Sequence, residues 1–95
     1  MTTKVYEYIL AIQREGNLSK AAEKCYISQP ALSQHIKLLE QKLNCKLFRQ
    51  ENGRMIPTKA GEIFLITADR IVQTEKETNE KLAALRERCN HFTSS

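Results

Sequence analysis

The last third of the sequence predicts one long helix, and this feature restricts the fold more than any other. From Lys59 to about Cys89 there is no proline, and the single glycine, Gly61, falls in the first turn after the capping residue Thr58. A helix of roughly 31 residues is about 46 Å long. Residues 1–57 would form a head with a radius of gyration of about 10 Å. The helix is therefore expected to extend well beyond the head.

Spacing along this helix predicts a seam for a second helix. Eight positions recur at intervals of 4, 3, 4, 3, 4, 3 and 4 residues, the 3.5-residue period of a coiled coil: Phe64, Ala68, Ile71, Glu75, Thr78, Leu82, Leu85 and Cys89. The alternative is a single amphipathic helix docked on its own domain. Since Leu82–Cys89 would lie beyond the head, we predict a homodimer.

Three shorter helices are predicted before the long one. Their ranges, taken from capping residues, breakers and apolar spacing, are Thr3–Glu15, Lys20–Cys25, and Gln29 to about Leu43. Ser19 and Ser28 are the expected N-caps of the second and third helices. Two apolar stripes are expected to face the core: Val5, Tyr8, Ile9 and Ile12 in the first helix, and Leu32, Ile36, Leu39 and Leu43 in the third.

A short β-hairpin is predicted between the third and fourth helices. Lys46–Arg49 is a strand candidate, Asn52-Gly53 lies in a turn, and Arg54–Pro57 would return antiparallel to the first strand. The sequence thus predicts a mainly α fold with a small β wing.

The second and third helices are joined by a three-residue turn, which is typical of a helix-turn-helix. The third helix carries no acid on its polar face before Glu40. The side chains on this face suit DNA: glutamine amides can bond adenine, serine can bond either kind of base edge, and proline can touch a thymine methyl. We therefore assign base reading to Gln29, Pro30, Ser33 and Gln34, and phosphate contacts to Ser28 and Lys37.

Charge and composition support a nucleic-acid partner. The net charge is +4, and the excess lies before Thr58, where nine Lys and Arg stand against five Asp and Glu.

No apolar run approaches the roughly 20 residues of a membrane span. The three widely spaced cysteines argue against a disulfide framework and for a reducing cytosol. We find neither a metal-ligand spacing nor a catalytic arrangement, and we predict no enzyme activity and no metal site.

The segment 21–40, AAEKCYISQPALSQHIKLLE, together with Leu43, Leu47-Phe48 and Pro57–Glu62, resembles the signature of LysR-type transcriptional regulators. The resemblance covers about residues 3–90. It implies a winged helix-turn-helix DNA-binding domain over 1–57, with the helix-turn-helix at about 18–37 and the wing at about 46–57. A linker and dimerisation helix over 58–90 follows. It further implies base contacts by the residues matching Gln29, Pro30, Ser33 and Gln34, and phosphate contacts by Ser19 and the wing, where Arg54 is preferred to Arg49.

The resemblance implies a function as well as a fold. We expect a sequence-specific double-stranded DNA-binding domain of a bacterial, cytoplasmic regulator. It is expected to bind an inverted-repeat promoter site as a dimer with antiparallel linker helices. The full-length protein could form a higher oligomer. Residues 91–95 would lead to an effector domain absent from this sequence, so a small-molecule effector is expected only there and no cofactor is expected here. The alternative is a protein-interaction or assembly module without sequence-specific DNA binding.

Overall fold

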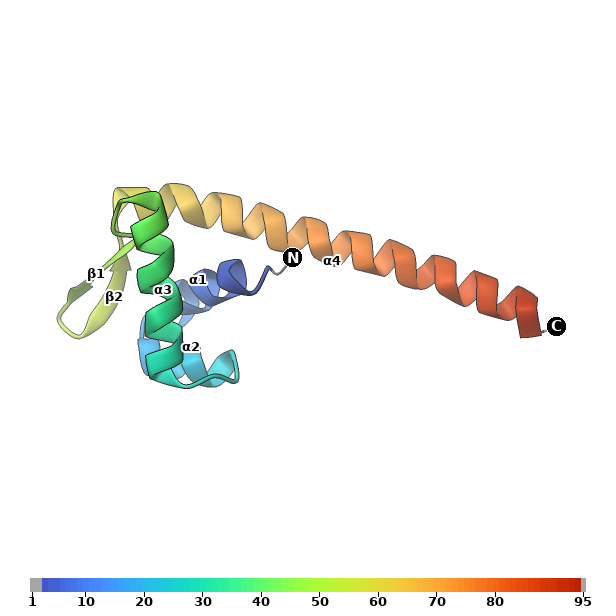
Figure 1. The fold of residues 1–95 in the computed structure, drawn as a ribbon, viewed down its shortest axis with the longest axis horizontal. Coiled ribbons are helices and arrows are strands. Elements are labelled where there is room, and N and C mark those ends of the chain that lie inside the picture. The colour runs from blue at the N-terminus through green and yellow to red at the C-terminus, as the bar shows by residue number, and fades with distance from the viewer. Residues whose placement is uncertain (1–2, 95) are drawn as a thin grey trace.

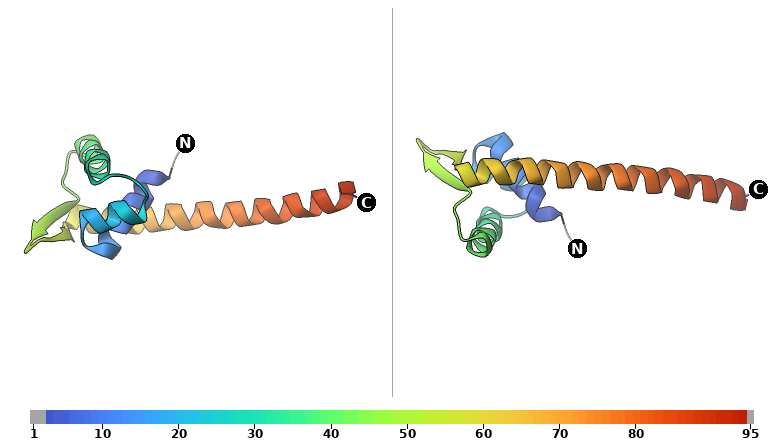
Figure 2. Two further views of the ribbon diagram at one scale, coloured as in Figure 1. Left: turned by 90° about the horizontal axis from the view of Figure 1, so that it is seen from below. Right: turned by 90° about the horizontal axis from the view of Figure 1, so that it is seen from above.

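The computed structural model describes residues 3–94, and side chains up to residue 88. It is mainly helical, with one two-stranded antiparallel sheet, and confirms the predicted fold class (Figure 1). The elements in chain order are α1 (Lys4–Glu15), α2 (Leu18–Lys24), α3 (Gln29–Leu43), β1 (Phe48–Glu51), β2 (Arg54–Pro57) and α4 (Lys59–Ser94). The molecule measures 61 × 24 × 20 Å because α4 projects from one side of the head (Figures 1 and 2).

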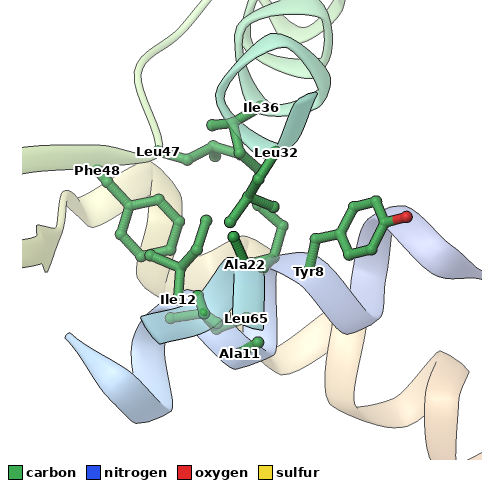
Figure 3. Close-up of a cluster of buried hydrophobic side chains, with 11 residues drawn as sticks. Tyr8, Ala11, Ile12, Ala22, Leu32, Ile36, Leu47, Phe48 and Leu65 are labelled. Carbon is green, nitrogen blue, oxygen red and sulfur yellow. The ribbon is translucent and has the colours of Figure 1, made fainter. Parts of the chain in front are cut away.

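Helix α1 is the centre of the head. It contacts α2, α3, α4 and β2, so its apolar stripe is covered from several directions. Side chains from the helices and from the start of the wing converge on one cluster (Figure 3). Its largest fully buried members are Ile9, Ile12, Leu32 and Leu47. Burying a side chain of this size contributes roughly 1.5–3 kcal/mol. The cluster therefore fixes α3 relative to α1 and thereby positions the polar face of α3.

The third helix has the predicted bounds, but its apolar stripe is only half covered. Leu32 and Ile36 are buried, Leu39 is partly buried, and Leu43 is 42% exposed. The expectation that Leu43 faces the core is therefore wrong. It lies in the last turn of α3, before Asn44 ends the helix in the left-handed conformation. A helix of 15 residues is longer than the small core beneath it.

The second helix begins earlier than predicted. Its N-cap is Asn17, whose side-chain oxygen accepts a hydrogen bond from the backbone N–H of Lys20 at 3.0 Å. Ser19 therefore lies inside α2 and is not the cap. Asparagine and serine are about equally good N-caps, and the extended backbone of Asn17 (φ −155°, ψ 131°) is the conformation that a cap requires. The hydroxyl of Ser19 is consequently available for another partner.

The wing is a hairpin shifted by two residues from the prediction on its first strand. β1 pairs with β2 from Phe48 opposite Pro57 to Glu51 opposite Arg54. The predicted strand at Lys46 and Leu47 is wrong because their backbone groups are bonded elsewhere: the hydroxyl of Thr58 donates to the Lys46 carbonyl, and the Leu47 N–H donates to Glu40. The turn is the two residues Asn52-Gly53, both with positive φ (50° and 77°), as a type I′ turn requires.

Helix α4 has two parts with different surroundings. Its first part packs on α1, where the rings of Tyr6 and Phe64 stack with centroids 5.7 Å apart and the Thr3 hydroxyl donates to the Glu75 carboxylate at 2.6 Å. Beyond these contacts the helix extends away from the head (Figure 1). It continues to Ser94, so the predicted end of the helix at residue 90 is wrong and the backbone of residues 91–94 is helical. No proline or glycine follows Gly61, so nothing in the sequence stops the helix from propagating.

The predicted seam is consequently divided between two environments. Ala68 is buried, and Phe64 and Ile71 are half-buried; this stretch of α4 packs on the head of the same chain. The prediction that all eight seam positions face a second chain is therefore wrong for Phe64, Ala68 and Ile71, because α1 of the same chain covers this part of α4. Thr78, Leu82 and Leu85 are exposed. The side chain of Cys89 lies outside the described residues.

Candidate nucleic-acid interface

The turn between α2 and α3 presents the N-terminus of α3. Tyr26 has a positive φ of 59° and reverses the chain, and Ile27 packs against the core. Ser28 is the predicted cap: its side-chain oxygen accepts from the Ala31 N–H at 3.2 Å. Pro30 lies in the first turn, where a missing N–H costs no helical hydrogen bond. The first turn of α3 is thus held by local bonds and points its first residues into solvent.

One face of α3 is polar and accessible along its first two turns. Gln29, Pro30, Gln34 and Lys37 are exposed, and Ser33 is partly so. Leu32 and Ile36 occupy the opposite face and are buried. Residues three and four apart share a helix face, so the four predicted base-reading residues and Lys37 lie together. A helix with this face fits the major groove, which is about 12 Å wide.

Glu40 is the only acid on α3, and its carboxylate is engaged at the connection to the wing. Oε2 accepts from the backbone N–H of Leu47 at 2.8 Å, and Oε1 is 3.7 Å from the ammonium of Lys46. Its side chain is only 11% exposed. The Glu40 carboxylate, which would repel a phosphate backbone if it were exposed, therefore binds the chain at the start of the wing.

The two arginines of the wing differ in their surroundings. Arg49 forms an ion pair with Glu51 on the same strand, with 2.6 Å between Nε and Oε2. Arg54 lies over Gly16, where an added Cβ would be 3.1 Å from its guanidinium, and the next residue, Met55, donates its N–H to the Gly16 carbonyl at 3.0 Å. Within the described residues no acid pairs with Arg54. Arg54 is therefore the wing cation with the charge available for a phosphate.

Ser19 and Gln29 are in contact across the helix-turn-helix. The hydroxyl of Ser19 in α2 donates to Oε1 of Gln29, the first residue of α3, at 2.6 Å. The sequence predicted a separate task for each side chain and did not predict the bond. Two polar residues ten positions apart give no periodic signal, so only the packing of α2 on α3 could reveal it.

Cys25 and Cys45 are free thiols, and neither belongs to a metal-ligating cluster in the part of the chain that the structure describes. Cys25 packs against the core, and burial, with a smaller contribution from the Glu7 carboxylate, raises the pKa of its thiol. A redox-sensing cysteine needs the opposite shift. Among residues 3–88, whose side chains the structure describes, no three metal-ligating side chains form a cluster, and no described helix is long and apolar enough to cross a bilayer.

Together, the α2–α3 pair, the wing and the polar face of α3 define a winged helix-turn-helix, a class of DNA-binding fold. The comparisons with known proteins agree. Residues 4–62 match the family model described as "Bacterial regulatory helix-turn-helix protein, lysR family". The chain belongs to the LysR family of DNA-binding transcription regulators, as the resemblance predicted.

Among curated proteins, the chain is 43% identical over 76 residues to a "Probable RuBisCO transcriptional regulator" of Cyanophora paradoxa, an alignment that covers 80% of the chain and 24% of that protein. It is 39% identical over 77 residues to the "Uncharacterized HTH-type transcriptional regulator YcgK" of Bacillus subtilis strain 168, which covers 81% of the chain and 24% of that protein. The chain thus spans about a quarter of the length of these relatives.

Solved structures show the same architecture. The BenM DNA-binding domain in complex with catB site 1 DNA aligns with a TM-score of 0.83 and 26% identity, over 90% of this chain and 96% of that one. The CbnR DNA-binding domain in complex with DNA aligns with a TM-score of 0.79 and 27% identity, over 88% and 97% of the two chains. Vibrio fischeri DarR in complex with DNA gives 0.82 and 29%, over 92% and 30%.

Proposed function

We propose that this protein binds double-stranded promoter DNA sequence-specifically, as a homodimer on a site with two inverted half-sites, and so regulates transcription in the cytoplasm. The observation that carries the proposal is the exposed, acid-free N-terminal face of α3 on a helix-turn-helix. The similarity to structures whose titles name DNA complexes supports it.

In this proposal the side chains divide into base readers and phosphate contacts. Gln29, Pro30, Ser33 and Gln34 would face base edges in the major groove, since recognition helices read bases with their N-terminal residues. The capped N-terminus at Ser28, together with Lys37 and Arg54, would hold phosphates on either side. The exposure of all three residues and the absence of an acid partner for Lys37 or Arg54 among the described residues support this division.

The dimer proposal rests on the distal part of α4. Leu82 and Leu85 are 47% and 54% exposed, and they continue the stripe that α1 covers nearer the head. A second copy with an antiparallel α4 would cover them and place one head at each end of the pair. Two heads related by a two-fold axis require two inverted half-sites about one helical turn apart or slightly more. No cofactor is part of this proposal, and a small-molecule effector would act on a domain beyond this sequence.

Selection of duplexes from a random library, followed by fluorescence anisotropy with the selected and a shuffled duplex, tests the DNA part of the proposal. We expect an enriched inverted repeat that binds at least 1,000-fold more tightly than the shuffled duplex, at the low end for specific binders. Equal affinity for both duplexes would refute sequence-specific binding and favour an assembly module. Sedimentation velocity of the free and DNA-bound protein tests the dimer, which a one-to-one complex on the full repeat would contradict.

A further inference from the structure

We propose that Ser19 is a positioning residue for base recognition: its hydroxyl holds the amide of Gln29 in the orientation that reads the base edge. This inference rests on the proposed DNA-binding function and adds a specificity determinant on α2, outside the recognition helix. The observation behind it is the 2.6 Å hydrogen bond from the Ser19 hydroxyl to Oε1 of Gln29.

The geometry gives the hydroxyl a defined effect on the amide. Both side chains are exposed, so packing does not restrain Gln29. A glutamine side chain loses considerable rotamer freedom when it is fixed, and that loss weakens binding unless the side chain is ordered beforehand. The bond to Ser19 orders it before DNA arrives. Ser19 itself is held in the first turn of α2, whose N-terminus Asn17 caps.

The bond also decides which end of the amide faces which way. An amide offers two N–H donors on one side and a carbonyl oxygen with two lone pairs on the other. With Oε1 turned toward α2, one lone pair is used by Ser19, and the Nε2 donors and the second lone pair are left for a base. A base edge is distinguished by its order of donors and acceptors. Fixing the amide therefore sharpens discrimination at the base pair that Gln29 reads.

This role competes with the phosphate contact expected for Ser19. A hydroxyl has a single proton to donate. When that proton is on Oε1 of Gln29, it cannot also be donated to a phosphate oxygen. The two roles make different predictions, because a phosphate contact strengthens binding to every duplex, whereas a positioning residue acts only through Gln29.

A double-mutant cycle separates the two roles. The wild type, Ser19→Ala, Gln29→Ala and the double variant are titrated by anisotropy against the selected duplex and the shuffled duplex. We expect Ser19→Ala to weaken binding to the selected duplex about five- to tenfold, the scale of one ordered side chain, and to leave the shuffled duplex unchanged. In the Gln29→Ala background, Ser19→Ala should have no further effect. The variant Ser19→Thr keeps the hydroxyl and should restore binding.

Two controls make the result specific. Ser33→Ala removes a proposed base contact that has no bond to Ser19, so its loss and that of Ser19→Ala should multiply. Far-UV circular dichroism melts should be the same for Ser19→Ala and the wild type, because the residue is exposed and is not the cap. As a further readout, duplexes substituted at each position of the half-site should show that Ser19→Ala flattens the base preference only where Gln29→Ala does.

Three outcomes overturn the inference. Equal weakening on both duplexes identifies Ser19 as a phosphate contact. Losses that multiply in the Ser19→Ala, Gln29→Ala double variant show that the two residues act independently. If the wild type prefers no duplex, the proposed function fails and the inference fails with it. If the wild type prefers the selected duplex but the free-energy losses of Ser19→Ala and Gln29→Ala add in the double variant, only this inference fails.

Discussion

Replacing Gly61 by alanine is expected to destabilise the fold strongly, although helix propensity predicts the reverse. A Cβ at residue 61 would lie 2.0 Å from the carbonyl oxygen of Leu47 and 3.3 Å from Cβ of Pro57. To reach even 3.0 Å, the start of α4 and the chain entering the wing must separate by about 1 Å. That same carbonyl accepts the N–H of Thr58 at 3.0 Å, so the separation breaks a bond that begins α4.

The magnitude follows from opposing contributions. Alanine in a helix is favoured over glycine by about 1 kcal/mol. Overpacking against backbone costs roughly 1–3 kcal/mol, and loss of the bond to Leu47 adds about 1 kcal/mol or more. We expect a net loss of about 1–3 kcal/mol in the free energy of unfolding. In a domain of this size, 1 kcal/mol shifts Tm by about 4–8 °C, so the expected decrease in Tm is about 4–24 °C.

Thermal unfolding followed by circular dichroism at 222 nm, at one fixed protein concentration, measures this change. Gly53→Ala is the matched control, because residue 53 has φ of 77° but no atom within 4 Å of an added Cβ. It suffers backbone strain alone, about 1–2 kcal/mol. A Tm of Gly61→Ala equal to or above that of the wild type would refute the reasoning, since the close approach to Leu47 would then be relieved without cost.

Three further predictions concern the proposed DNA binding and assembly. In anisotropy titrations, Ser33→Ala should weaken binding to the selected duplex by about 1–3 kcal/mol and leave binding to the shuffled duplex unchanged. Equal losses of affinity for both duplexes would exclude base reading by Ser33. Lys37→Gln and Arg54→Gln should each weaken binding to all duplexes and reduce the slope of log affinity against log salt concentration by about one. An unchanged slope would show that the substituted residue makes no phosphate contact. The variant with Leu82→Lys and Leu85→Glu should sediment as a folded monomer. Its affinity for the inverted repeat should be much reduced, because the second head no longer binds at high effective concentration. If the variant remains a dimer, the interface lies elsewhere.

The sequence predicted the elements whose boundaries depend on local chemistry. The bounds of α3 are correct because Ser28 caps it, Pro30 fits its first turn and Asn44 ends it, and each of these signals acts within four residues. The turn at Asn52-Gly53 is correct for the same reason. The start of α2 was wrong because Asn17 and Ser19 are comparable caps, and the choice between them depends on the chain direction after Gly16.

Contacts between distant segments could not be predicted in this way. The seam spacing of 3.5 residues and the surface-helix spacing of 3.6 differ little over the stretch from Phe64 to Glu75, so periodicity could not show that α1 covers it. The bond between Ser19 and Gln29 and the approach of Gly61 to Leu47 likewise arise from tertiary packing. The polar face of α3 was nevertheless predicted correctly as a surface, because burial of Leu32 and Ile36 leaves it exposed.

The division of α4 into a docked and a free part also makes it a mechanical arm. The head is clamped to the first part of the helix by the Tyr6–Phe64 stack and the Thr3–Glu75 bond. Residues 76–94 form an arm of about 28 Å without an intervening proline or glycine. Tilting such an arm by about 6° displaces one end by about 3 Å, close to the 3.4 Å rise of one base pair. In the proposed complex, a small angular change at the far end of α4 would therefore displace the head by about one base-pair step.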